Sequence, residues 1–301
     1  MARMSDTAPR FAVVIPTMNR AEQLERTLQA LEGQTRAGFD IVVVDDSPEV
    51  DQNLEGRAAE GSLSVIRGPR RGLSHARNLG WRATSTETVV FLDDDCLPDS
   101  DWAEEFERAL TDHPEASFVS GFVGEHEPPE GDYVPVTISP VIREGVKRGR
   151  WTKPWEIGFT LCMAIRRQTL ESLEGFDERL GPGVKEFPSS EDMDFNYRFL
   201  KAGGVAYVTP RIRAMHDQWR STTELPKHFR GYAAGVAGFA MKHLRSGDVL
   251  GGLWLWQFGV FDFARMLASA ARRRSALRLR IAWWKLRGLV SGTAKGFARA
   301  W

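Results

Sequence analysis

Val89-Val90-Phe91-Leu92-Asp93-Asp94-Asp95 places an apolar run directly before three carboxylates. The apolar part has the length and composition of a buried strand, whereas burying an unpaired carboxylate is costly. We therefore expect a strand that ends at Leu92, with the aspartates at its solvent-facing end. Adjacent carboxylates supply the hard oxygen ligands that suit Mg2+ or Mn2+, which commonly bind together with substrate phosphates. The alternative is an acidic turn before a helix that begins near Trp102.

Apolar runs of the same kind recur along the first 120 residues and alternate with helical patterns. The sequence predicts strands at 11–15, 41–44, 63–66 and 88–92, and helices at 21–32, 49–60 and 74–85. This alternation predicts an α/β fold with a doubly wound, mostly parallel, Rossmann-like sheet and helices on both faces. Regular patterns resume after residue 160, and they predict a strand at 161–166, a helix from about Thr169 and a helix that ends near Ala202, capped by Ser189 or Ser190.

Polar residues follow three of the predicted strands. They are Pro16-Thr17-Met18-Asn19, Asp45-Asp46 and Asp93-Asp94-Asp95. Because ligands of open α/β sheets bind at the carboxyl ends of the strands, we expect these clusters to share one ligand site.

The carboxyl-terminal part differs in charge from the rest of the chain. Residues 245–301 hold eleven Lys or Arg and two acids, a net +9, although the whole chain has a net charge of zero. They also contain half of the ten tryptophans. We expect helices over residues 222–301, with breaks near Gly247, at Gly251-Gly252 and around Ser275. Basic residues beside tryptophans favour either an anionic membrane surface or an amphipathic hairpin that packs on the rest of the chain or on a second subunit. Nucleic acid is not expected as a partner, because no nucleic-acid-binding motif accompanies the charge.

Other features indicate the cellular location. Residues 1–10 are polar, which predicts a disordered terminus without a signal peptide. Cys96 and Cys162 lack the spacing of a metal site or a disulfide framework, as expected of a cytoplasmic protein. Since no run approaches about 20 apolar residues, a transmembrane helix is not expected. The basic tail allows peripheral attachment to the inner face of the cytoplasmic membrane.

Six short motifs occur in an order that is familiar. They are Val13-Val14-Ile15-Pro16-Thr17-Met18-Asn19-Arg20, Val42-Val43-Val44-Asp45-Asp46-Ser47, Gly72-Leu73-Ser74-His75-Ala76-Arg77-Asn78-Leu79-Gly80, Phe91-Leu92-Asp93-Asp94-Asp95, Gly175-Phe176-Asp177-Glu178 and Ser190-Glu191-Asp192-Met193-Asp194-Phe195. On these motifs the chain resembles the family 2 inverting glycosyltransferases, which have the GT-A nucleotide-sugar fold. The resemblance covers residues 11–220 and implies a glycosyltransferase domain there, with residues 221–301 as a helical extension.

The resemblance implies a role for each matching residue. Pro16, Thr17 and Asn19 would cradle the nucleoside, and Asp45 would accept a hydrogen bond from a pyrimidine, so that UDP or dTDP is favoured over GDP. Arg77 would point toward the nucleotide, and its alternative is a solvated charge on a helix. The implied nucleotide site comprises Pro16, Thr17, Asn19, Asp45, Arg77, Asp93 and Asp94. The implied ligands of Mg2+ or Mn2+ are Asp95, Asp93 and His216.

Transfer with inversion needs one carboxylate that takes a proton from the acceptor hydroxyl. The resemblance implies that Asp192 is this general base and that Glu191 orients the acceptor or the backbone. Adjacent helical residues point about 100° apart, so the two carboxylates cannot face the same atom. The expected acceptor is a hydroxyl of a glycan or of a lipid-linked acceptor.

Two other functions remain open. A sugar nucleotidyltransferase could share the fold and the metal, although Pro16-Thr17-Met18-Asn19-Arg20 lacks the glycines of its phosphate loop. A non-catalytic module that binds nucleotide sugars or glycans is disfavoured by the intact Asp192. The stretch Phe159-Thr160-Leu161-Cys162 departs from many relatives, so contacts to the sugar or the acceptor are expected to differ.

Overall fold

The computed structural model describes residues 11–126, 143–217 and 219–301, together with the backbone of 133–135. The expected disorder of residues 1–10 falls outside these residues. The strands are β1 (Phe11–Thr17), β2 (Asp40–Asp45), β3 (Ser64–Arg67), β4 (Thr88–Leu92), β5 (Cys96–Pro98), β6 (Phe118–Glu125), β7 (Tyr133–Pro135), β8 (Gly145–Arg148), β9 (Cys162–Arg166), β10 (Val205–His216) and β11 (Trp219–Ser221). The helices are α1 (Ala21–Glu32), α2 (Gln52–Ala59), α3 (Leu73–Ala83), α4 (Trp102–Asp112), a 3-10 turn (Pro154–Ile157), α5 (Arg167–Ser172), α6 (Glu191–Lys201), α7 (Leu225–Arg245), α8 (Val249–Arg273) and α9 (Ala276–Ala298).

The main sheet has the order β3-β2-β1-β4-β9-β6-β10-β5, and β8 pairs with β10 at its side. The first four strands of this order are parallel, and β1 pairs through Val14 with both Val42 and Phe91. Strand β9 is antiparallel to both of its neighbours, β4 and β6. The prediction of an α/β fold with a mostly parallel sheet is therefore confirmed.

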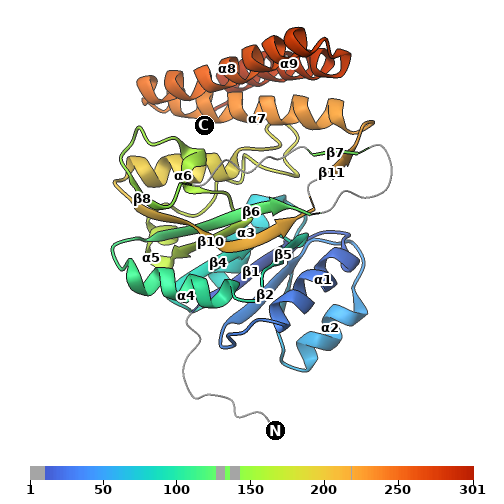
Figure 1. Ribbon diagram of the computed structural model, residues 1–301, viewed down its shortest axis with the longest axis vertical. Coiled ribbons are helices and arrows are strands. Elements are labelled where there is room, and N and C mark those ends of the chain that lie inside the picture. Colours follow the sequence, from blue (N-terminus) through green and yellow to red (C-terminus); the bar gives the residue numbers. More distant parts are fainter. Residues whose placement is uncertain (1–10, 127–132, 136–142, 218) are drawn as a thin grey trace.

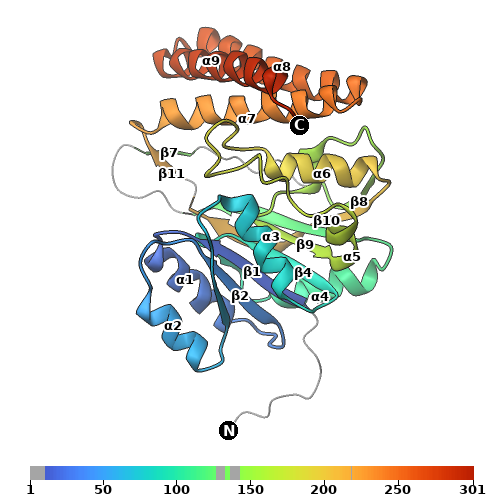
Figure 2. The same cartoon turned by 180° about the vertical axis from the view of Figure 1, so that it is seen from behind.

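Each face of the sheet has its own core, because side chains alternate along a strand. Val13 and Ile15 of β1 pack with α1, α2 and α4 on one face. Val14, which lies between them, packs with α3, α5 and α6 on the other face. Figures 1 and 2 show these two helical layers from opposite sides. Parallel strands with both faces covered bring the ends of β1, β2 and β4 to one edge.

Two of the expected helix signals are wrong in detail. Ser190 is the residue that precedes α6, but its φ of 75° and ψ of 18° are left-handed and its side chain makes no capping hydrogen bond. The break expected at Gly251-Gly252 does not occur, because α8 begins at Val249 and continues through both glycines. A Cβ on Gly252 would lie 2.5 Å from the backbone of Leu244, so the glycine permits close packing of α8 on α7 rather than a turn.

Helices α7, α8 and α9 form a bundle on the other side of α6 from the sheet (Figure 1). Gly288 and Gly292 of α9 face α7, where a Cβ would lie 2.2 and 2.4 Å from backbone oxygens of that helix. The bundle shares a core with the α/β part, in which Tyr197 of α6 packs with Phe239 of α7 and Leu255 of α8. None of the described helices is long and apolar enough to cross a membrane.

Candidate active site

The three aspartates after β4 have different partners at the edge of the sheet. Asp94 accepts hydrogen bonds from the Thr17 hydroxyl at 2.7 Å and from Arg20 Nη1 at 3.0 Å. The same Arg20 nitrogen lies 2.7 Å from Asp95 Oδ2. Burial, opposed by Arg20, raises the pKa of Asp94 to about 6. The ends of β1 and β4 are thus joined through charged hydrogen bonds, as the shared edge requires.

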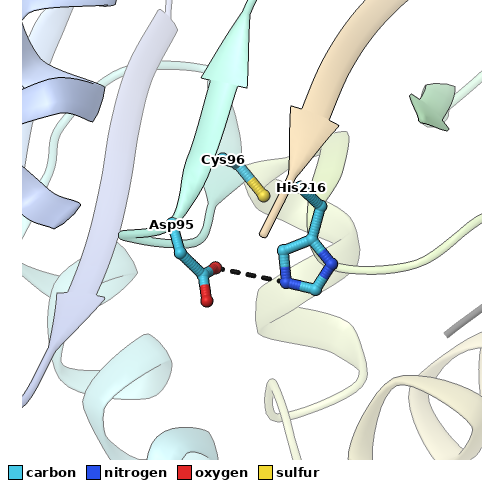
Figure 3. Close-up of side chains that lie close together, drawn as sticks. All are labelled: Asp95, Cys96 and His216. Carbon is cyan, nitrogen blue, oxygen red and sulfur yellow. Dashed lines mark ion pairs between the residues drawn. The ribbon is translucent and has the colours of Figure 1, made fainter. Parts of the chain in front are cut away.

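Asp95 and His216 form the best-defined candidate for a metal site. His216 ends β10 and is paired across the ladder with Cys96, the residue after Asp95. The His216 Nε2 atom lies 3.2 Å from Asp95 Oδ1, and Figure 3 shows the two side chains pointing toward each other. Burial opposes ionisation of Asp95, but His216 and Arg20 outweigh it and lower the pKa of this carboxyl.

The chemistry of these donors fits a divalent cation. His216 Nδ1 is buried and has no hydrogen-bond partner among the described residues, and the close partner of the buried Asp95 Oδ1 is His216 Nε2. The Cys96 sulfur is within 4.8 Å of the two other ligand atoms, and burial raises the pKa of this thiol well above its ordinary value. The carboxylate of Asp95 and the imidazole of His216 supply oxygen and nitrogen donors, which suit Mn2+ or Mg2+.

Asp93, Asp94 and Asp95 form what we call the acidic edge of the sheet. Arg77 joins this edge to the start of α6. Its Nη2 donates to Asp93 Oδ1 at 2.7 Å and its Nη1 to Glu191 Oε1 at 2.9 Å. The side chain is only 1% exposed, so the alternative of a solvated helix charge is wrong. Burial disfavours the charged guanidinium, but Asp93 and Glu191 outweigh it and raise the pKa of Arg77. A direct role of Arg77 in nucleotide binding stays a prediction, because its Nη1 and Nη2 atoms already donate to protein carboxylates.

Asp192 lies at the start of α6, directly after Glu191. Its Oδ1 accepts a hydrogen bond from the backbone N–H of Met193 at 2.8 Å, and no side chain of the described residues hydrogen-bonds to the Asp192 carboxylate. Burial, reinforced by the Glu191 charge, raises the pKa of Asp192 to about 7. Glu191 is engaged with Arg77, so the two adjacent carboxylates have separate partners. A half-buried carboxylate with a pKa near neutrality can take up a proton at physiological pH.

The remaining expected nucleotide residues line the end of β1 and β2. Asp45 accepts from the backbone N–H of Ser47 at 2.8 Å and forms an ion pair with Arg67. The backbone N–H of Asn19 donates to the Ser47 hydroxyl at 2.8 Å, and Pro16 lies within β1. These contacts bring the residues together at one edge, while their binding to a nucleotide stays a prediction.

Two features of the site were not anticipated. Arg20, which neutralises Asp94 and Asp95, stands in a quoted motif, and its position directly after the strand end was the available signal. Asp194 of α6 is fully buried and pairs with Arg198 at 2.7 Å, a spacing of four residues that is typical of ion pairs on helices. The same carboxylate also contacts Lys242 and His243 of α7, for which no local signal exists.

The mostly parallel sheet, the carboxylates at its edge and the carboxylate at the start of α6 together define a GT-A type glycosyltransferase fold. The sequence model described as "Glycosyl transferase family 2" matches residues 12–173, more than half of the chain. The chain belongs to this family.

Curated relatives carry glycosyltransferase names. A "Pre-mycofactocin glycosyltransferase" of Mycobacterium tuberculosis is 27% identical over 239 residues, which cover 77% of this chain and 47% of the relative. A "Validoxylamine A glucosyltransferase" of Streptomyces hygroscopicus is 28% identical over 247 residues, which cover 70% of this chain and 56% of the relative. The chain therefore spans about half the length of these relatives.

Solved structures share the fold at lower identity. The mannosyltransferase PcManGT from Pyrobaculum calidifontis, in complex with GDP-Man and Mn2+, has a TM-score of 0.61 at 20% identity and covers 97% of this chain and 88% of its own. Residues 1–349 of S. aureus TarS, in complex with UDP-GlcNAc, have a TM-score of 0.55 at 17% identity, with coverage of 96% and 90%.

Proposed function

We propose that this protein is an inverting glycosyltransferase, which moves a sugar from a nucleoside diphosphate sugar to a hydroxyl group of a glycan or a lipid-linked acceptor. The observation that carries the proposal is Arg77, which hydrogen-bonds on one side to Asp93 of the acidic edge and on the other to Glu191, next to Asp192. Such a reaction needs carboxylates near the diphosphate and a carboxylate that acts as base, and Arg77 links the candidates for the two roles, Asp93 and the start of α6. A binding protein without activity would not need the base.

Asp192 is the proposed general base. The acceptor hydroxyl loses its proton as its oxygen attacks the anomeric carbon, and the carboxylate takes up this proton. A pKa of about 7 leaves a substantial fraction of Asp192 ionised near neutral pH and makes it a stronger base than an ordinary aspartate. Glu191 and Arg77 hold the beginning of α6 beside the acidic edge.

Asp95 and His216 are the proposed ligands of Mn2+ or Mg2+, whereas Asp93, the third predicted ligand, hydrogen-bonds to Arg77. Such a cation, when bound, neutralises the charge on the diphosphate leaving group. We propose a uracil or thymine base for the donor, because the family resemblance assigns Asp45, at the end of β2, to accept a hydrogen bond from a pyrimidine N–H. Arg67 already contacts this carboxylate, but each of its oxygens has a second lone pair.

The outer surface of the helical bundle supports a membrane-bound acceptor. Eight large apolar side chains of α8 and α9 are 50–70% exposed: Val249, Leu250, Leu253, Phe261, Leu279, Trp283, Val290 and Phe297. Figures 1 and 2 show α8 and α9 as the outermost layer, on the far side of α7 from the sheet. Apolar side chains within a region of net +9 suit an anionic membrane surface, where the acceptor would be lipid-linked. A second subunit that covers the same face is the competing proposal.

The enzymatic proposal is tested by product analysis. The full-length protein is incubated with Mn2+ and a panel of UDP-, dTDP- and GDP-sugars, and nucleotide release is followed. We expect the parent protein to release a nucleoside diphosphate. Asp192→Asn should lose this release, and Asp262→Asn, the control with the same substitution on α8, should keep it. Pyrophosphate as the product would instead indicate a nucleotidyltransferase, and release of neither product from any donor would contradict the proposal.

A further inference from the structure

Asp194 occupies an unusual position in the first turn of α6. Its side chain is completely buried, and its backbone N–H donates to Ser190 at 3.0 Å, so it belongs to the turn that carries Asp192. The carboxylate contacts three basic side chains: Arg198 at 2.7 Å, Lys242 at 2.7 Å and His243 at 2.9 Å. Two of the three come from α7, nearly 50 residues away in the chain. This turn is therefore held from outside the α/β fold.

Lys242 connects three parts of the molecule. Its ammonium nitrogen lies 2.7 Å from Asp194 of α6 and 2.6 Å from Asp177, in the loop that follows α5. Asp177 in turn pairs with Arg179 at 2.7 Å. Removal of the Lys242 ammonium would take away the cation that the buried carboxylates of Asp177 and Asp194 share. Like charges in a buried place repel strongly.

The basic side chains also act on the ionisation of these acids. Burial opposes the charge on Asp194, but Arg198, Lys242 and His243 outweigh it, and the pKa of the carboxyl lies well below its ordinary value. Asp177 behaves in the same way, with a pKa lowered to about 2. The charged forms of both acids are therefore favoured at neutral pH, and Lys242 contacts both of them.

The start of α6 has few other supports. Glu191 is held by Arg77 on the side of the acidic edge, and Ser189 donates to the backbone oxygen of Tyr232 on α7 at 3.1 Å. Asp192 itself makes its only side-chain hydrogen bond, within the described residues, to its own helix. The position of its carboxylate is therefore set by the placement of this turn.

We propose that Lys242 of α7 is a positioning residue for the reaction: its bridge between Asp194 and Asp177 places the first turn of α6, and with it Asp192, against the acceptor. This proposal rests on the proposed function of Asp192. It gives α7 a role in the reaction, although the family resemblance ends at residue 220 and assigns this helix to a C-terminal extension.

The test compares variants of the full-length protein. Lys242→Met removes the ammonium, and Lys242→Arg restores a cation. Lys285→Met is the matched control, because Lys285 also pairs with a carboxylate, Asp262, but at the contact between α8 and α9. The assays are turnover of the nucleotide sugar that gives the fastest nucleoside diphosphate release, binding of UDP with Mn2+ by calorimetry, and folding by circular dichroism.

We expect turnover of Lys242→Met to fall about 100-fold, the size of effect produced by displacing a reacting group by about 1 Å. Affinity for UDP with Mn2+ should stay within about twofold of the parent, because the acidic edge is intact. Lys242→Arg should recover most of the lost turnover, and Lys285→Met should keep it. If Lys242→Met does not fold, Lys242→Gln, which retains a hydrogen-bond donor without the charge, takes its place with the same expected split.

Two results would overturn the proposal. One is a folded Lys242 variant without the charge whose turnover stays within about threefold of the parent. The other is a parallel loss of UDP affinity and turnover, which would indicate general damage to the α/β part. Failure of the proposed function is a different result, since the parent protein would then release no nucleoside diphosphate at all.

Discussion

Replacement of Asp192 by Asn should abolish transfer and, at the same time, stabilise the fold in a pH-dependent way. The folded-state pKa of Asp192, about 7, lies above the ordinary value of 3.8. A raised pKa means that the folded protein binds a proton more tightly than the unfolded chain does. The contribution of the carboxyl to stability is therefore complete below the ordinary pKa and is lost as the pH rises through about 7. Asn remains neutral at all pH values and avoids this loss.

The size of the effect follows from the same pKa values. One pKa unit corresponds to about 1.4 kcal/mol, so the rise to about 7 corresponds to at most about 4 kcal/mol. The carboxylate is only half-buried, and solvent screens part of its charge. We therefore expect Asp192→Asn to raise the free energy of unfolding by about 1 to 2 kcal/mol at about pH 8, and by almost nothing at about pH 4.

Urea denaturation of the two proteins at these pH values measures the difference. In parallel, turnover of the parent should rise with pH through about 7, as the base loses its proton, while Asp192→Asn should stay about 100-fold or more below it throughout. A stability difference that is the same at both pH values would refute the raised pKa. Full turnover in the Asn variant would refute the role of Asp192 as base.

Three further results are expected. Asp95→Ala should weaken binding of UDP in the presence of Mn2+ and remove most turnover, whereas full turnover with a chelator present would exclude a metal role. Arg77→Met should lower the free energy of unfolding by about 3 to 5 kcal/mol in urea, because it leaves the buried Glu191 and the partly buried Asp93 unpaired; an unchanged midpoint would show that the bridge is dispensable. The parent should bind anionic vesicles less as salt rises, and Phe261→Ser/Trp283→Ser should bind them more weakly. If this double variant instead turns a dimer into a monomer, the outer face is a subunit contact.

Much of the α/β architecture could be predicted from the sequence. Runs such as Val13 to Ile15 and Val89 to Leu92 are apolar on both faces, which is typical of strands buried on both sides, and both strands occur as expected. The position of β9, antiparallel between β4 and β6, could not be predicted, because a run of five residues carries no information about its neighbours. A break in a helix was expected at Gly251-Gly252. The close approach of Leu244, which explains Gly252, is a tertiary contact and leaves no local signal in the sequence.

The part of the site that could be predicted is the part that lies directly at strand ends. Asp93, Asp94 and Asp95 lie at an edge of the sheet because their strand is apolar. The pairing of each aspartate was not predictable, since Arg20 and Arg77 reach them from other elements, although the position of Arg20 directly after a strand end was a signal that it lies at this edge. A basic residue in a helical pattern has the same local signature whether it is solvated or buried, and only the packing of α3 against the sheet distinguishes the two for Arg77.

The contacts of Arg20 and Arg77 with the acidic edge also bear on how a donor enters. Two guanidinium groups offset about half of the charge of Asp93, Asp94, Asp95 and Glu191, which weakens the pull of the edge on a free cation from solution. A divalent cation and the diphosphate of a nucleotide sugar carry equal and opposite charges, and their complex adds no net charge when it arrives. The electrostatic arrangement therefore favours delivery of the metal by the donor itself, and it predicts that affinity for the metal alone is low and depends on the nucleotide.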